Sequence, residues 1–150
     1  MSLDELYREV ILDHYRNPRR RGRLDDADTH ADGHNPLCGD EVSVELSFDG
    51  DRIADIAVTG QGCSISQASA SMMAEAIVGK ALDEVAELTH RFKVMMDIEE
   101  GDAGLDASRP GEILGDLEAL QGVRRFPVRI KCADLPWVTL TDAIAERGAT

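Results

Sequence analysis

The sequence is poor in cysteines, aromatic residues and basic residues, and each shortage excludes a class of protein. Three cysteines cannot close a disulfide framework because their number is odd. Apolar runs are short and interrupted by charges, so no segment is expected to span a membrane. A formal net charge of −13 argues against general binding to nucleic acid or to anionic membranes.

The N-terminal residues and the cysteines together predict where the protein acts. The chain starts with an acidic segment, Met1 to Glu5, which has none of the apolar character of a secretion signal. Unpaired thiols are typical of a reducing compartment. We therefore expect a cytoplasmic protein. Its 150 residues fit one domain, residues 1–150, with an aliphatic core because aromatic residues make up only 4% of the chain.

The hydrophobic pattern alternates between the periods of helices and of strands. Residues 41–48 alternate strictly, Asp49-Gly50 is a hairpin signal, and a return strand is expected over 53–59. Residues 24–37 are polar and predict irregular structure, and 97–118 predict an exposed acidic insertion. The prediction is α+β: a small antiparallel sheet with helices on one face. Helices are expected over residues 3–15, 64–78, 82–96 and 128–145, the last with Pro136 either kinking it or delaying its start.

The cysteines lie in unusual local contexts, at the predicted boundaries of elements. Cys38 and Asp40 are two residues apart at the start of a strand, so period-two geometry predicts that both side chains share a face. The hairpin can carry Cys63 back toward that strand's start, and Cys132 can join them in space. Three thiolates and a carboxylate suit one zinc ion or an iron–sulfur cluster at one end of the sheet. The alternative is that the cysteines are only buried apolar fillers.

Basic residues and histidines give weaker signals. Arg129 and Lys131 flank Cys132 closely enough to offset the excess negative charge of a thiolate site. Five arginines between Arg16 and Arg23 form either a solvated loop or a docking site for an acidic partner. The histidines are weak ligand candidates: His14 is expected to be packed and His90 exposed, and His30 and His34 lie in a polar loop.

The cysteine contexts also carry a resemblance to a known family. Residues 35–40 (NPLCGD), 60–66 (GQGCSIS) and 129–132 (RIKC) resemble the SufU family, part of the superfamily of IscU-like and NifU-N-terminal-like proteins. Residues 6–19, 67–73 and 120–123 match as well, so the resemblance covers nearly the whole chain. Scaffolds of the IscU type have His immediately before the third Cys, where this chain has Lys131. That difference and the 97–118 segment favour the SufU side, and the resemblance implies a SufE/NifU-like fold.

The resemblance implies a zinc-dependent sulfurtransferase. Cys38, Asp40, Cys63 and Cys132 would be the zinc ligands, and Cys38 would accept persulfide sulfur from a PLP-dependent cysteine desulfurase. In the family mechanism, a desulfurase His replaces Cys38 on zinc, and Arg129 helps to engage the desulfurase. The sulfur would pass to a downstream iron–sulfur scaffold complex. The alternatives are an iron–sulfur cluster scaffold that uses the same four ligands, and a plain structural-zinc adaptor.

Overall fold

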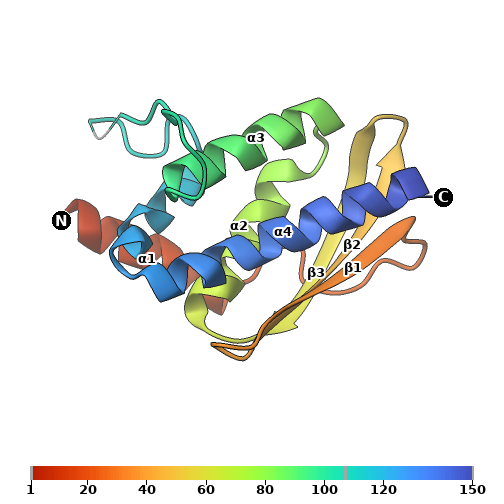
Figure 1. Cartoon of the computed structure of the whole chain (residues 1–150), viewed down its shortest axis with the longest axis horizontal. Helices are drawn as coiled ribbons and strands as arrows, with labels where there is room; N and C mark the ends of the chain where they lie inside the picture. The colour runs from red at the N-terminus through yellow and green to blue at the C-terminus, as the bar shows by residue number, and fades with distance from the viewer. Residues whose placement is uncertain (1, 107, 150) are drawn as a thin grey trace.

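The computed structural model describes residues 2–106 and 108–149, and the side chains of these as far as residue 147. Residue 107, inside the predicted acidic insertion, lies outside the described residues. A three-stranded antiparallel sheet in the order β1-β2-β3 forms one layer, and helices cover one of its faces (Figure 1). The elements along the chain are α1 (Leu3–Arg16), β1 (Thr29–Asn35), β2 (Asp40–Asp49), β3 (Arg52–Gln61), α2 (Ser64–Ile77), α3 (Leu82–Met95), the 3₁₀ helix η1 (Gly115–Arg125) and α4 (Pro127–Ala149).

The predicted α+β class is confirmed, but the sheet has one strand more than the sequence indicated. Residues 29–35 form β1, so the prediction of irregular structure across 24–37 is wrong there. The strand lacks an apolar signature because it lies very close to α4: a Cβ on Gly33 would come within 2.0 Å of Thr139 Oγ1. Small residues are needed for that approach, and they give no hydrophobic alternation.

The α4 helix is the longest element and crosses the molecule beside the sheet (Figure 1). It contacts β1 and β2, and α2 contacts β3. Pro136 lies within α4, and the helix begins at Pro127 and continues past it, so the predicted later start is wrong. None of the helices in the described parts of the chain has both the length and the apolar character needed to cross a membrane.

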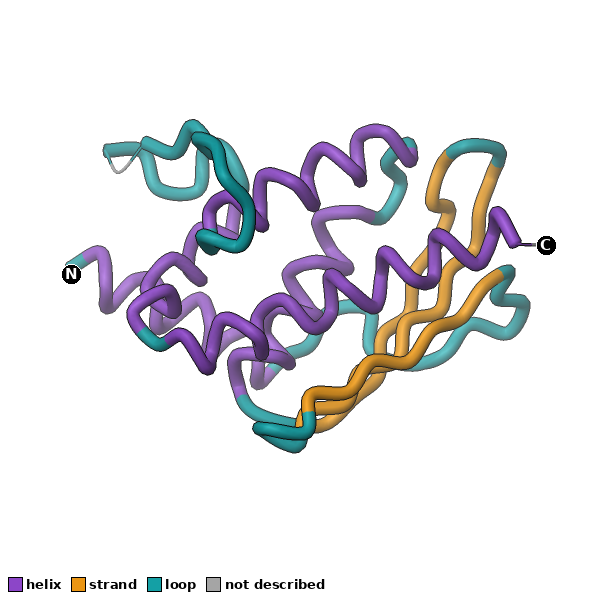
Figure 2. The backbone as a smooth tube through the Cα atoms, viewed as in Figure 1, coloured by secondary structure: helices purple, strands orange, loops and turns teal. Residues whose placement is uncertain are grey.

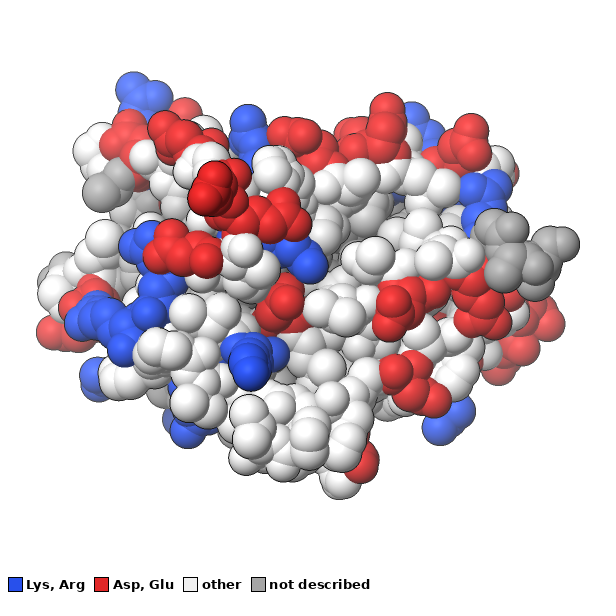
Figure 3. Space-filling view, in the orientation of Figure 1, with Lys and Arg blue, Asp and Glu red and all other residues white. Residues whose placement is uncertain are grey.

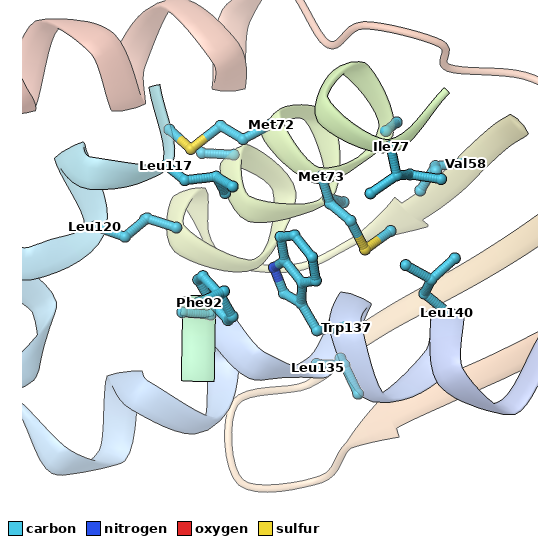
Figure 4. Close-up of a cluster of buried hydrophobic side chains, with 14 of the residues drawn as sticks. Val58, Met72, Met73, Ile77, Phe92, Leu117, Leu120, Leu135, Trp137 and Leu140 are labelled. Atoms are coloured by element: carbon cyan, nitrogen blue, oxygen red, sulfur yellow. The ribbon is translucent and has the colours of Figure 1, made fainter. Parts of the chain in front are cut away.

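The core lies between α2, α3, α4 and the sheet (Figure 4). It is built mainly from aliphatic and methionine side chains, as the composition predicts. The exceptions are Trp137 and Phe92, whose rings stack with centroids 4.5 Å apart and planes 16° apart. The Trp137 Nε1–H donates to Ser69 Oγ at 3.2 Å, which satisfies the one polar group of this buried ring.

The predicted exposed insertion is only partly exposed. Residues 97–102 are at the surface, in the loop that folds back beside α3 (Figure 2). Leu114, Leu117 and Glu118 are buried, however, so the prediction is wrong for the last part of the segment. Both Glu118 carboxylate oxygens accept backbone N–H groups, from Gly111, Ile113 and Leu114, at 2.9–3.1 Å. The burial of this acid could not be predicted from the sequence, because its partners are backbone groups that no residue type marks.

The arginine-rich segment lies along the free edge of β3. The Val58 N–H donates to the Arg20 carbonyl at 3.0 Å, and the Gly22 N–H donates to the Val58 carbonyl at 3.1 Å. The Arg20 side chain also pairs with Asp55 at 3.0 Å. Pairing covers a strand edge that would otherwise offer unpaired backbone groups to another chain. These contacts give the segment a structural role, whether it is a solvated loop or a docking site for an acidic partner.

Candidate metal and thiol site

The turn between β1 and β2 carries the first two candidate residues. Cys38 lies in this turn, half-buried, and Asp40 is the first residue of β2. The Asp40 side chain is completely buried. An isolated buried carboxylate is costly, so its partners decide what it can do.

The return of β3 brings Cys63 beside Asp40. Glu41 pairs with Gln61 across the two strands, so the chain reaches residue 63 next to the start of β2. Cys63 is also the N-cap of α2, where its Sγ accepts the Ser66 N–H at 3.5 Å. A helix N-terminus favours negative charge, which suits a thiolate at this position.

The Asp40 carboxylate is held in one orientation by groups from the start of α2. Its Oδ1 accepts the Cys63 N–H at 2.8 Å and the Ser66 Oγ–H at 3.1 Å. Its Oδ2 lies 3.9 Å from the Cys63 Sγ. Gly62 makes this possible: a Cβ there would lie 2.2 Å from Asp40 Oδ1, and its φ is +145°.

Cys132 reaches the same place from α4. Its Sγ is buried and lies 3.3 Å from the Cys38 Sγ. The Asn35 side-chain amide at the end of β1 donates to Cys132 Sγ at 3.8 Å. The ligand atoms of Cys38, Asp40 and Cys132 all lie within 4.8 Å of one another, and Cys63 adjoins this group through Asp40. The structure thus brings together all four residues that the sequence singled out.

Burial controls the ionisation of Cys132 in the absence of a cation. It raises the pKa of the Cys132 thiol well above its ordinary value, and hydrogen bonding to Asp40 and Cys38 and the charge of Cys63 add to the shift. Three thiols and a buried carboxylate can be negative together only beside a cation. The donor set and its close spacing therefore fit a zinc ion, which thiolate and carboxylate ligands both suit.

The two basic residues near Cys132 differ in their relation to the thiols. The Cys63 thiolate raises the pKa of Arg129, by its charge and by a hydrogen bond, with smaller contributions from Cys132 and Cys38. The Arg129 side chain is exposed and lies against the site. Lys131 is exposed as well, and no contact among the described residues joins it to a thiol.

Sequence reasoning missed Asn35 and Ser66. Both are buried polar residues that position the site: Asn35 contacts Cys132, and Ser66 contacts Asp40. A signal for Ser66 was present, since a polar residue three positions after a helix-capping residue forms part of capping motifs. Asn35 lies in the 35–40 motif, but nothing local indicated its contact with Cys132, which spans 97 positions of sequence.

Large apolar side chains that are close in sequence to Cys38 and Cys132 are exposed. Leu37 precedes Cys38 and is 69% exposed, and Phe126 and Val128 at the start of α4 are 61% and 58% exposed. The end of the molecule where the β1–β2 turn lies is largely uncharged in Figure 3, whereas acidic side chains gather along the opposite edge. Exposed apolar groups beside a reactive centre are typical of a protein-binding surface.

Comparison with known proteins places this arrangement in a family. The model of the NifU-like N terminal domain matches residues 6–133. A relative from Bacillus subtilis, named zinc-dependent sulfurtransferase SufU, is 47% identical over 97% of this chain and 93% of its own. A Streptococcus pyogenes relative, named iron-sulfur cluster assembly scaffold protein IscU, is 42% identical over 95% of this chain and 85% of its own.

A solved structure shows the same fold. A protein of Fervidobacterium islandicum, described as a putative iron-sulfur cluster assembly scaffold protein for the SUF system, superposes with a TM-score of 0.80. It is 36% identical, and the match covers 95% of this chain and 98% of the other. The agreement of domain, sequence and fold shows that the chain belongs to the NifU-like N-terminal domain family and, within it, to the SufU family.

Proposed function

We propose that this protein is a zinc-dependent sulfurtransferase of iron–sulfur cluster assembly. Cys38 accepts persulfide sulfur from a PLP-dependent cysteine desulfurase in the cytoplasm and passes it to a downstream scaffold complex. The observation that carries the proposal is the unequal placement of the thiols. Cys132 is buried in α4, and Cys63, half-buried like Cys38, is held at the N-cap of α2, whereas Cys38 lies in a turn directly after the exposed Leu37.

The metal would be held by Cys38, Asp40, Cys63 and Cys132. Bound zinc would keep these thiols deprotonated at neutral pH and would add no redox chemistry of its own. Asp40 keeps a fixed direction because Cys63 N–H and Ser66 Oγ–H both bind its Oδ1. Arg129 lies against the thiolate side and offsets part of the negative charge of the four ligands.

The reaction at Cys38 is a thiol–disulfide type of exchange. The Cys38 thiolate attacks the terminal sulfur of the desulfurase persulfide, and a new S–S bond forms at Cys38. The old S–S bond breaks, the desulfurase cysteine leaves as a thiolate, and the transferred sulfur keeps its proton. Leu37, Phe126 and Val128 offer a docking surface that would exclude water from this exchange.

Alanine release by the cognate desulfurase tests the proposal. The zinc-loaded protein should accelerate release saturably, and Cys38→Ala should abolish the acceleration. Mass spectrometry of the digested product should place the extra sulfur on the peptide that contains Cys38. Both proteins must be matched for zinc content and circular dichroism, so that a loss reports the missing thiol and not a lost fold. Full acceleration by Cys38→Ala, or sulfur found on Cys63 or Cys132, would overturn the assignment.

A cluster scaffold is the second candidate, favoured by the names of several relatives. The same four side chains would hold the cluster. Lys131 weakens this candidate, because a protonated amine donates hydrogen bonds and does not bind iron. Anaerobic reconstitution distinguishes the two: a stable cluster that passes intact to an apo-acceptor, with no effect on alanine release, would favour the scaffold.

A further inference from the structure

A second group of metal-ligating side chains lies outside the thiol site. His14 in α1, Glu75 in α2 and Asp116 in η1 each offer a ligand atom, and these atoms lie within 4.8 Å of one another. The three residues line a pocket of about 460 Å³ whose other walls include Met72, Leu88 and Leu114. None of the four thiol-site residues lines this pocket in the described part of the chain.

The His14 ring is fixed as metal-ligating histidines are. It is completely buried, and its Nδ1 is 2.8 Å from Ser71 Oγ. Its Nε2 points to Asp116 Oδ2 at 2.7 Å. A hydrogen bond at the other ring nitrogen fixes the direction of the ring, as it does in metal-ligating histidines. Asp116 Oδ2 can only accept, so Nε2 carries the hydrogen of that contact in the metal-free chain; a metal on Nε2 would need the Nδ1–H tautomer, whose hydrogen the Ser71 hydroxyl can accept.

The two carboxylates face the pocket without being buried. The side chains of Glu75 and Asp116 are 55% and 51% exposed, so a hydrated ion can reach them. In the metal-free chain their charge is met by other groups: Arg19 Nε lies 3.5 Å from Glu75, and His14 binds Asp116. A cation would therefore replace Arg19 and the His14 hydrogen bond as the partners of these carboxylates.

We infer that His14, Glu75 and Asp116 form a second, hard-ligand site for a divalent transition-metal ion such as Mn²⁺ or Fe²⁺, with water completing the coordination. One imidazole and two carboxylates suit these ions, whereas the thiolates of the first site select softer ones. The two sites would therefore divide metals by chemistry. An ion here would also bridge α1, α2 and η1 and thereby hold the end of the acidic segment on the body of the protein.

Mn²⁺ alone is the probe that separates the two sites. Zinc-loaded protein, with its thiol site already filled, is titrated with Mn²⁺ while the relaxation of water protons is recorded. We expect saturable binding of one ion per chain. Asp116→Asn and Glu75→Gln each remove a charged ligand and should weaken Mn²⁺ binding by about tenfold or more. Both side chains are partly exposed, so we expect the fold to stay intact.

A matched control guards against general attraction to an acidic protein. Glu87→Gln removes one exposed carboxylate from α3, outside this cluster, and should leave Mn²⁺ binding unchanged. Arg19→Gln removes the cation that pairs with Glu75 and should tighten binding, a gain that misfolding cannot produce. The inference is overturned if Mn²⁺ does not saturate, if Glu87→Gln weakens binding as much as Asp116→Asn, or if Arg19→Gln has no effect.

Discussion

At the scale of single residues, Gly62 is the most constrained position near the thiols. A Cβ there would meet the Asp40 carboxylate and backbone, at 2.2 Å from Oδ1 and 2.9 Å from Cα. We expect Gly62→Ala to turn Asp40 away from the thiols and to lower zinc affinity by about tenfold or more. Competition with a chelating dye measures this affinity.

Gly22→Ala is the matched control for that substitution. Gly22 has a similar φ of +140°, compared with +145° for Gly62, but a Cβ there meets no atom within 4 Å. Both variants therefore carry the same kind of backbone strain, and only one carries the clash. Equal zinc affinities in the two variants would refute the role assigned to Gly62.

Arg129 is the residue that we propose to contact the desulfurase beside the thiols. We expect Arg129→Gln to raise the half-saturating concentration in the desulfurase assay by about tenfold, a loss of about 1.4 kcal/mol of binding. Arg124→Gln is the control, since that side chain is exposed on η1 and interacts with Gln121 and Asp97. If the two variants behave alike, Arg129 acts only through the net charge.

At the scale of elements, one buried acid holds the end of the acidic segment. Glu118→Gln keeps one acceptor oxygen but turns an NH₂ group toward a backbone N–H, so a buried polar group loses its partner. We expect a loss of about 1–3 kcal/mol in the free energy of unfolding, measured with urea. Glu112→Gln, in an exposed pair with Arg109, should cost less than about 1 kcal/mol. An equal, small loss in both would contradict the capping role.

Tyr7 connects α1 to η1 and makes that contact sensitive to alkali. Its hydroxyl accepts the Gln121 side-chain amide at 3.0 Å. Burial raises the pKa of the Tyr7 hydroxyl, and the Glu118 carboxylate adds to the shift. A folded pKa above the unfolded value means that the stabilisation is complete below about pH 10, the unfolded value, and is lost as the pH rises through the folded pKa.

Tyr7→Phe separates this effect from other alkaline titrations. Near pH 7 the variant should be less stable than the wild type by about 1 kcal/mol, the usual value of one hydrogen bond. The difference should shrink as the pH rises above about 10, because only the wild type ionises at this position. Urea unfolding at several pH values provides the measurement, and a difference independent of pH would exclude the coupling.

The elements that the sequence predicted well are those whose burial follows one period. The strand over 41–48 has one buried face, and the helix over 3–15 has one face that is partly buried, so their pattern is local. β1 was missed because Gly33 packs under Thr139, a contact between positions far apart in the chain. The burial of Leu114 and Leu117 was missed because acidic residues and glycines dominate the sequence around them.

At the scale of the whole molecule, the proposed zinc ligands connect three separate parts of the fold. They come from the β1–β2 turn and the first residue of β2, the N-cap of α2 and the second turn of α4. Ligand binding stabilises the folded state by about 4 kcal/mol when the free ion is a thousandfold above its dissociation constant. We therefore expect chelation to lower the melting temperature, by calorimetry, and Asp40→Asn to show little zinc dependence. An unchanged melting temperature after verified removal of zinc would contradict this.

The convergence of the four candidate residues could be predicted, but not the way they are held. Cysteine contexts and hairpin geometry were enough to bring Cys38, Asp40 and Cys63 to one end of the sheet. Cys132 lies 94 positions after Cys38. Its ligand chemistry made a meeting possible, but only the resemblance implied it. That residues 1–150 form one domain stays a prediction from chain length. The proposed second metal site could not be predicted from the sequence, because His14, Glu75 and Asp116 share no motif.

The proline inside α4 separates the helix into two parts. Pro136 has no N–H to give to the carbonyl of Cys132, four residues earlier, so the turn that carries this cysteine has one helical bond fewer than its neighbours. The part before Pro136 carries Arg129 and Cys132, and the part after it packs Trp137 and Leu140 into the core. The missing hydrogen bond makes Pro136 the point at which α4 bends most easily, between the turn that carries Cys132 and the part that packs Trp137 and Leu140 into the core.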